Sequence, residues 1–188
     1  MKPLPRVLAA ASALAAALAC ASPAIATPDA SEAEIKAAFL CKFGNYVEWP
    51  AGAVAASAAE PVPFGIAIAG NEAETGVLQR VAAATNVGGR PIRVRRLLAG
   101  EAPQDERIVY VTRSQAARAA ELAATAVERG MLLVTDAAEA GIHGSMVNFV
   151  IEDNKVRFDV DLAEAATARL KVSGRLLSVA RKVTGGAP

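Results

Sequence analysis

The sequence holds few of the residues from which catalytic and metal sites are commonly built. It has two cysteines, Cys20 and Cys41, and a single histidine, His143. No CxxC, HExxH or GxSxG pattern occurs, and neither a GxGxxG turn nor a phosphate loop is present. We therefore predict a protein that is not an enzyme, with no catalytic residues, no metal site and no cofactor. An enzyme would need residues scattered in sequence, such as His143, Asp136 and Glu152, to converge.

A strong excess of charge of either sign is also missing. The chain has 20 Lys and Arg against 19 Asp and Glu, which gives a formal net charge of +1. Domains that bind nucleic acid usually carry a basic excess, so this balance predicts no nucleic-acid partner. One local basic cluster exists, formed by Arg90, Arg93, Arg95 and Arg96. Its alternating pattern is typical of the solvated face of an edge strand.

Long hydrophobic runs are confined to the N-terminus. Two basic residues precede an apolar stretch over residues 7–19, which is too short to span a bilayer, and an Ala-Ile-Ala cleavage site follows. Residues 1–26 are thus predicted to be a secretory signal peptide. They leave a single domain over residues 27–188, exported to the periplasm. The alternative is a lipid anchor at Cys20.

The first segment of that domain predicts an amphipathic helix over about residues 32–47. Its apolar stripe has four large side chains at spacings of three and four: Ile35, Phe39, Phe43 and Tyr46. Cys41 lies among them and is predicted to be a buried small hydrophobe without a disulfide partner. Pro50 ends the segment. Trp49 before it either closes over the core or presents an aromatic anchor to a partner.

The rest of the chain alternates short apolar strands with helices. Strands are predicted over residues 64–69, 91–97, 107–112 and 131–135, and helices over 74–85, 114–129, 162–170 and 173–183. A hairpin of residues 146–152 and 155–161 is predicted around the turn Asp153-Asn154. This order predicts an α/β fold, a flavodoxin-like three-layer sandwich. Its largely parallel sheet has helices on both faces and an antiparallel hairpin near the C-terminus.

Small polar residues follow three of the predicted strands. They are Asn71, Thr112, Ser114 and Asp136. In open α/β sheets ligands bind beyond the carboxyl ends of the strands, so these residues form a candidate ligand pocket. The alternative is that they are the turn and capping residues that any junction between a strand and a helix needs, with Ser114 as a helix cap.

Several segments, in order and at matching spacings, resemble the YfiR-like family of periplasmic regulators. The first is AAFLCKFGNYVEWP, residues 37–50, and the others are residues 87–92, 108–111, 133–136, 146–152, 155–161 and 170–181. The resemblance implies an α/β domain, often dimeric, that inhibits the periplasmic sensor domain of an inner-membrane diguanylate cyclase. Release of that inhibition would raise cyclic di-GMP and favour biofilm formation. An outer-membrane lipoprotein can sequester such an inhibitor.

The same resemblance places the partner-facing surface in the C-terminal region. Carried over to this chain, it points to four partner-binding residues: Asn148, Phe158, Ala166 and Leu170. The chain lacks the two disulfides of the family's namesake, so redox control through them is not expected. Two further hypotheses stay open beside the regulator. One is a periplasmic small-molecule-binding sensor that uses the strand-end residues, and the other is an enzyme.

Overall fold

The computed structural model describes residues 31–50, 62–137 and 144–186. The predicted signal peptide, Cys20 and His143 lie outside these ranges. The first described element is α1 (Glu32–Phe43), which Ser31 and Glu34 cap reciprocally, each side chain accepting from the other residue's backbone N–H. The candidate domain boundary at residue 27 stays a prediction.

Eight of the ten described strands form one sheet in the order β10-β8-β7-β6-β5-β2-β4-β3, and the other two pair with each other in a separate small sheet. Five neighbouring pairs are parallel, while the β7–β8 and β3–β4 pairs are antiparallel. The bounds are β2 (Phe64–Ala69), β3 (Asn86–Val87), β4 (Arg90–Arg96), β5 (Ile108–Val111), β6 (Leu132–Thr135), β7 (Val147–Glu152), β8 (Lys155–Asp161) and β10 (Lys182–Thr184). The largely parallel α/β sheet with its antiparallel hairpin is therefore confirmed.

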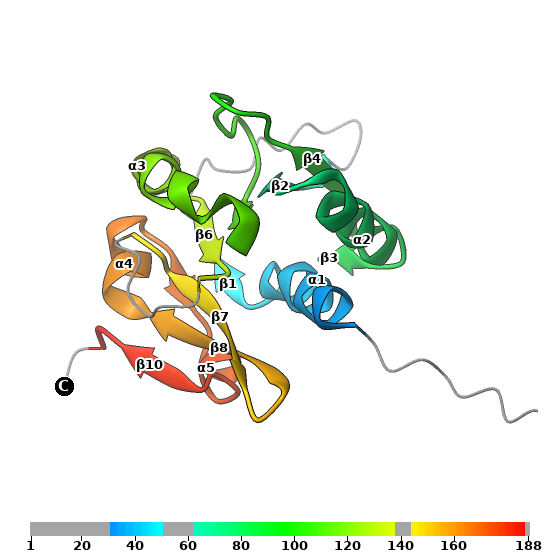
Figure 1. Ribbon diagram of the computed structural model, residues 1–188. Coiled ribbons are helices and arrows are strands. Elements are labelled where there is room, and N and C mark those ends of the chain that lie inside the picture. The colour runs from blue at the N-terminus through cyan, green and yellow to red at the C-terminus, as the bar shows by residue number, and fades with distance from the viewer. Residues whose placement is uncertain (1–30, 51–61, 138–143, 187–188) are drawn as a thin grey trace, which may run out of the picture.

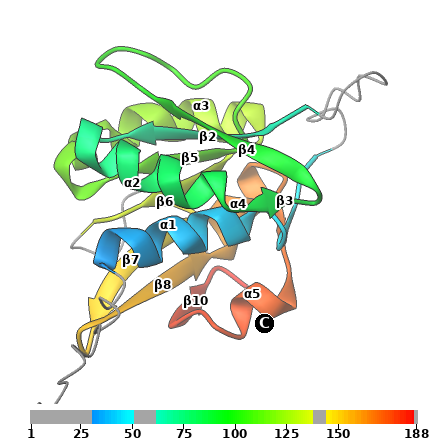
Figure 2. The same cartoon turned by 90° about the vertical axis from the view of Figure 1, so that its right-hand side faces the viewer.

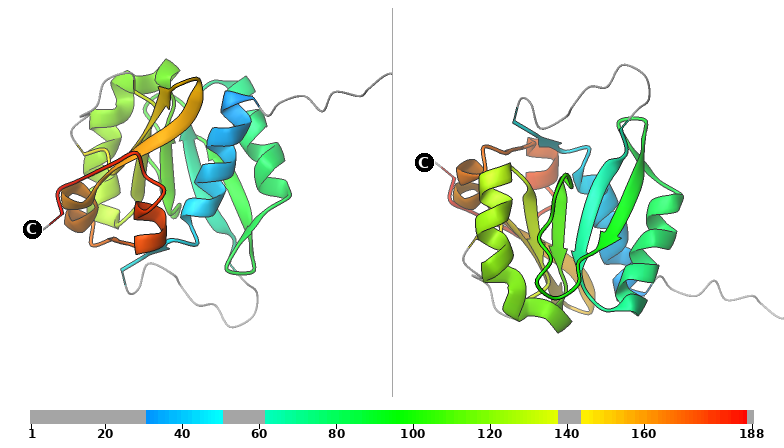
Figure 3. Two further views of the ribbon diagram at one scale, coloured as in Figure 1. Left: turned by 90° about the horizontal axis from the view of Figure 1, so that it is seen from below. Right: turned by 90° about the horizontal axis from the view of Figure 1, so that it is seen from above.

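Helices cover both faces of this sheet (Figures 1 and 3). On one face, α1 and α2 (Glu72–Ala83) pack over the larger part of the core, which includes Phe64, Ile66 and Tyr110. On the other face, α3 (Ala119–Arg129) packs against the opposite side chains of β5 and β6, among them Val109 and Leu133. Because alternate residues of a strand point to opposite faces, strands buried on both sides read as continuous apolar runs.

The hairpin between β7 and β8 turns where the sequence predicts it. Asp153 and Asn154 have φ values of 49° and 58°, the left-handed region that a two-residue turn of this kind requires. The register pairs Phe149 with Phe158 and Val147 with Val160, so these four side chains share the face toward α1. The hairpin reaches the periphery of the molecule beyond α1 (Figure 2).

The first helix is shorter than the apolar periodicity predicts. It ends at Phe43, and Val47–Glu48 form strand β1, which pairs antiparallel with β9 (Lys171–Val172). Gly44 is the C-cap, and the close packing there needs a glycine, because a Cβ would lie 2.8 Å from the Phe64 ring and from Val87. Trp49 is half-buried with its ring edge toward Phe64, at 5.9 Å between centroids, which favours the core interpretation. Cys41 is buried, as predicted.

The C-terminal helix predicted over residues 173–183 is wrong for most of its length. Only α5 (Gly174–Leu177) is helical, and the chain then adds β10 in parallel to β8. The open edge of β8 offers unpaired backbone groups, and β-branched Val183 and Thr184 suit a strand. The preceding helix, α4 (Leu162–Thr167), is capped by Asp161 as predicted, and the chain leaves it through Arg169 at φ 59°.

Candidate functional site: a polar cavity at the strand ends

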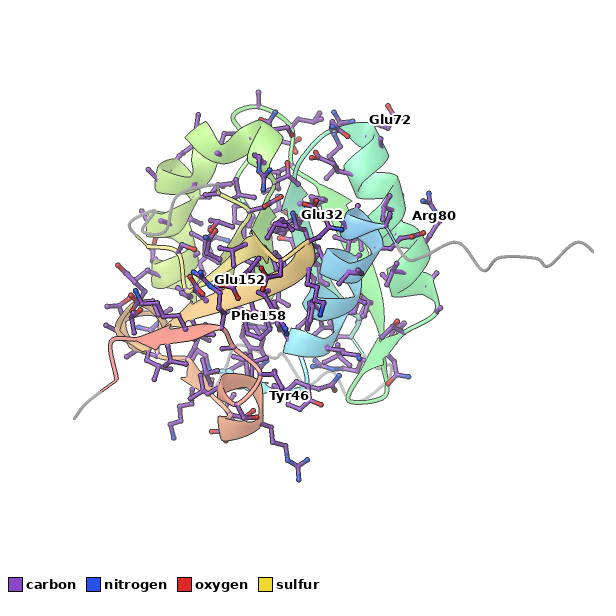
Figure 4. The ribbon with its side chains drawn as sticks, turned by 60° about the horizontal axis from the view of Figure 1, so that its bottom comes forward. Glu32, Tyr46, Glu72, Arg80, Glu152 and Phe158 are labelled. Atoms are coloured by element: carbon purple, nitrogen blue, oxygen red, sulfur yellow. The ribbon has the colours of Figure 1, made fainter. Side chains whose placement is uncertain are left out.

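A cavity of about 190 Å³ lies where β5 and β6 end, beneath the N-terminal turns of α1 and α2. It is lined by Glu32, Ala33, Lys36, Ala37, Leu40, Glu74, Leu78, Tyr110, Thr112 and Asp136. Figure 4 shows Glu32 at the start of α1, whereas Tyr46 lies beyond the other end of that helix. The position agrees with the general rule that ligands of open α/β sheets bind at the carboxyl ends of strands.

Glu74 forms hydrogen bonds with three of the four residues predicted for the pocket. Its Oε2 accepts from the backbone N–H of Asn71 at 2.7 Å and from the hydroxyls of Thr112 and Ser114 at 3.0 Å each. Glu74 lies in the first turn of α2, where the positive end of the helix dipole favours a carboxylate. The close approach depends on Gly70, because a Cβ there would lie 2.9 Å from that oxygen.

Asp136 is the second anionic centre and is 7 % exposed. Its Oδ2 accepts from Lys36 Nζ at 2.7 Å, and its Oδ1 accepts from Arg113 at 3.1 Å. Lys36 is itself buried and also forms an ion pair with Glu32 one turn earlier on α1. This chain of charges ties α1 to the end of β6, because a buried charge needs a partner to offset its lost hydration.

Tyr110 lines the same cavity as Glu74 and Asp136. Its ring packs edge-on against Phe149, with 6.0 Å between centroids. Burial, and then the negative charges of Asp136 and Glu74, raise the pKa of Tyr110 far above its ordinary value. The side chain is therefore a neutral phenol at physiological pH, able to donate one hydrogen bond and to accept others.

The structure places the four predicted pocket residues in one neighbourhood but in two roles. Thr112 and Asp136 line the cavity. Asn71 and Ser114 contact it only through Glu74. The prediction that Ser114 caps a helix is wrong: the chain enters a 3₁₀ turn, η1 (Arg113–Arg118), after Thr112, and no side chain caps that turn. The Ser114 hydroxyl is already turned toward Glu74.

Sequence reasoning missed three residues that define this cavity: Lys36, Glu74 and Tyr110. Lys36 left a usable signal, because it stands beside Ala37 and four residues before Leu40, on the helix face that the apolar spacing marks as buried. A lysine on a buried face needs an anionic partner. For Glu74 the signal is its position three residues after Asn71, the spacing of a capping box. That spacing predicts the contact with Asn71 but not the approach of Glu74 to the end of β5.

The four residues predicted to bind a partner occupy different environments. Phe158 is 1 % exposed and contacts Phe39 and Phe43 edge-on, at 5.4 and 5.2 Å between centroids. Leu170 is also buried, whereas Ala166 is exposed on α4. Ala166 is therefore accessible for direct contact with a partner. A role of the other three residues in partner binding stays a prediction.

Asn148, the fourth of these residues, is buried on β7, an inner strand of the sheet. Its side-chain oxygen accepts from the Thr135 hydroxyl at 2.8 Å and from the backbone N–H of Ala137 at 3.0 Å. These bonds hold the start of the segment after β6 against β7. Asn148 therefore positions the chain where β6 leads toward β7, close to Asp136.

Three of the five exposed large apolar side chains among the described residues belong to the C-terminal third of the chain. Ile151, Val179 and Val183 are 42, 57 and 41 % exposed. Ile151 pairs with Val156, and Val183 pairs with Val160, so both lie on the sheet face that α1 covers only in part. On the opposite face, Arg181 joins β8 to β7 by bonding Asp159 and Glu152. We call Ile151, Val179 and Val183 the C-terminal apolar set.

Two kinds of feature, a metal-binding cluster and a membrane-spanning helix, are absent from the described residues. No group of three or more His, Cys, Asp or Glu side chains there is placed to hold a metal ion. Within the same ranges no helix is long and apolar enough to cross a membrane.

Comparison with protein families identifies a match over most of the chain. A protein-family model described as YfiR/HmsC-like matches residues 33–181 and so confirms the resemblance derived from the sequence. A search among curated proteins finds no significant match.

Proposed function

The chain belongs to the YfiR/HmsC-like family, whose members are periplasmic regulators of diguanylate cyclase pathways, and from this we propose its function. The protein is a non-enzymatic periplasmic regulator that binds and inhibits the periplasmic sensor domain of an inner-membrane signalling protein, in the first instance a diguanylate cyclase. The observation that carries the proposal is the family match over residues 33–181, which spans most of the chain.

The C-terminal third supplies the proposed contact surface. It combines exposed Ala166 with the C-terminal apolar set, and large exposed hydrophobic side chains are what a protein partner buries. The buried residues of the carried-over set, Asn148, Phe158 and Leu170, would act through the shape of the hairpin and of α4. A homodimer, and sequestration by an outer-membrane lipoprotein, complete the proposal by analogy with the family.

The cellular test is deletion of the gene followed by measurement of cyclic di-GMP. Loss of an inhibitor should raise the nucleotide severalfold, and a plasmid copy should restore it. A strain that also lacks cyclase activity is the control, and there deletion should have no effect. Unchanged cyclic di-GMP with the cyclase expressed would reject the cyclase as the partner.

A second function is favoured by one specific observation, the cavity at the strand ends. A regulator could sense a small molecule there, and ligand binding could bias its affinity for the membrane partner. A ligand that binds only the folded protein raises its apparent stability. A metabolite screen by thermal shift tests this candidate, and a screen without any shift would count against it.

A further inference from the structure

The cavity is large enough for a small organic ligand, and its lining has an apolar part and a polar part. At about 190 Å³ it exceeds the engineered cavity of about 150 Å³ that admits benzene. Ala33, Ala37, Leu40 and Leu78 supply an apolar wall from the two helices. Carboxylates, a lysine and two hydroxyl-bearing side chains supply the rest, so a ligand with one polar end and a short apolar body would match both parts.

The charges that line the cavity favour a cation. Three lining residues are acidic, Glu32, Glu74 and Asp136, and one is basic, Lys36. Lys36 pairs with two of the acids, and Arg113 adds a second cation to Asp136. Glu74 is the exception, because it forms no ion pair with any described residue. Its Oε2 takes three neutral donors, and its Oε1 has no partner within the described ranges.

Tyr110 supplies a second polar group to the cavity, independent of the acidic residues. The residue is 6 % exposed, and its hydroxyl forms no hydrogen bond with any of the described residues. Arg118 Nε is the one enclosed side-chain polar atom without a partner among the described residues, so the Tyr110 hydroxyl is accessible from the cavity that it lines. A donor or acceptor inside the cavity would satisfy it. The same ligand group could then meet both the Tyr110 oxygen and Glu74, which line one cavity.

We propose that this cavity binds a small primary amine in its ammonium form, with a short apolar chain. The proposal rests on the second function above and names its ligand class. The ammonium group has three N–H donors and no acceptor. It donates to Glu74 Oε1 and to the Tyr110 oxygen, while its chain packs on Leu40 and Leu78. A carboxylate or phosphate would instead meet uncompensated negative charge at Glu74.

The experiment compares three probes of nearly equal size on the purified protein: n-pentylamine, 1-pentanol and pentanoate. At pH 7 the first is a cation, the second is neutral and the third is an anion. Isothermal titration calorimetry should give saturable binding of n-pentylamine, binding of 1-pentanol at least tenfold weaker, and no binding of pentanoate. Chemical-shift changes in a ¹⁵N spectrum should centre on α1 and the end of β5.

Two variants locate the site. Glu74→Gln keeps the shape and removes the charge, and should weaken n-pentylamine at least tenfold while leaving 1-pentanol unchanged. Glu72→Gln, the same change on the exposed side of α2, is the matched control and should bind normally. If Glu74→Gln fails to fold, Ala33→Phe serves instead, because an exposed helical alanine tolerates substitution and a phenyl ring there would fill the cavity.

Three results would overturn the proposal: no binding of n-pentylamine, equal affinity for the amine and the alcohol, or binding that survives Ala33→Phe. None of them would alter the expected rise in cyclic di-GMP on gene deletion. Failure of the amine site and failure of the regulator function are therefore distinguishable.

Discussion

The strand-end cavity and the C-terminal hairpin use polar and apolar side chains in opposite ways. At the strand ends, charged groups are buried: Lys36 and Asp136 are 4 and 7 % exposed. Around the hairpin, aromatic residues fill the inside, and large apolar residues such as Ile151 reach the surface. Buried charge gives directional recognition of a small molecule, whereas exposed apolar surface suits a protein partner.

This contrast separates two kinds of recognition on one domain. The cavity lies beside the N-terminal turn of α1. In the C-terminal apolar set, Ile151 and Val183 lie on strands at the other side of the sheet, and Val179 lies in the turn before β10. Phe39 and Phe43 of α1 nevertheless pack on the hairpin through Phe149 and Phe158. One helix thus contacts both regions, so a ligand that shifts α1 would also change the packing of the hairpin.

The largest effect should come from breaking the apolar side at Phe158. Phe158→Ala removes a ring from the four-ring cluster and should lower the free energy of unfolding by about 3–5 kcal/mol. Urea denaturation measures it. The control is Ile151→Ala, at an exposed site, which should cost less than about 1 kcal/mol. If Phe158→Leu folds yet no longer binds the membrane partner, the ring has a role beyond packing.

The next effect should come from breaking the polar side at Lys36. Lys36→Met leaves the buried Asp136 carboxylate with Arg113 as its cation and should cost about 3 kcal/mol. The double variant Lys36→Met/Asp136→Asn also removes the buried carboxylate that has lost its lysine, and should recover part of that loss. A double-mutant cycle measured by denaturation gives the coupling. A coupling near zero would show that the pair does not tie α1 to β6.

The third effect is a pH dependence of stability that comes from Cys41, which lies on α1 in the apolar core. Burial raises the pKa of its thiol from 9.0 to about 11. The folded state therefore holds this proton more tightly, so the contribution of Cys41 is complete below pH 9 and is lost as the pH rises toward about 11. Wild type should lose up to about 2 kcal/mol more than Cys41→Ala across that window. Parallel curves for the two proteins would contradict this.

The smallest effect should come from the hairpin turn. Asn154→Ala places a Cβ without a compensating side chain at φ 58° and should cost about 1 kcal/mol. Asn154→Gly is the control and should be nearly neutral, because glycine adopts this conformation freely. Denaturation midpoints compare the two. An alanine variant as stable as the glycine variant would mean that the turn can relax.

The sequence predicts the central strands of the sheet well and the short peripheral strands of the molecule poorly. The buried strands β2, β5 and β6 are short apolar runs, which can be recognised from local sequence alone. Val47–Glu48 and Lys182–Thr184 are strands only because β9 and β8 offer them a partner, which no local pattern reveals. The same holds for the cavity: Thr112 and Asp136 follow from strand-end position, whereas Lys36 reaches Asp136 across 100 residues of chain.

The central claim is that the C-terminal third binds a membrane sensor, and the most direct measurement is binding of the purified protein to the periplasmic domain of an inner-membrane diguanylate cyclase. Wild type should bind, and Ile151→Arg/Val183→Arg should weaken binding at least tenfold. Leu98→Arg, at an exposed apolar site outside that region, should bind like wild type. Equal affinity of all three proteins would contradict the proposed surface, and no binding by wild type would contradict the proposed partner.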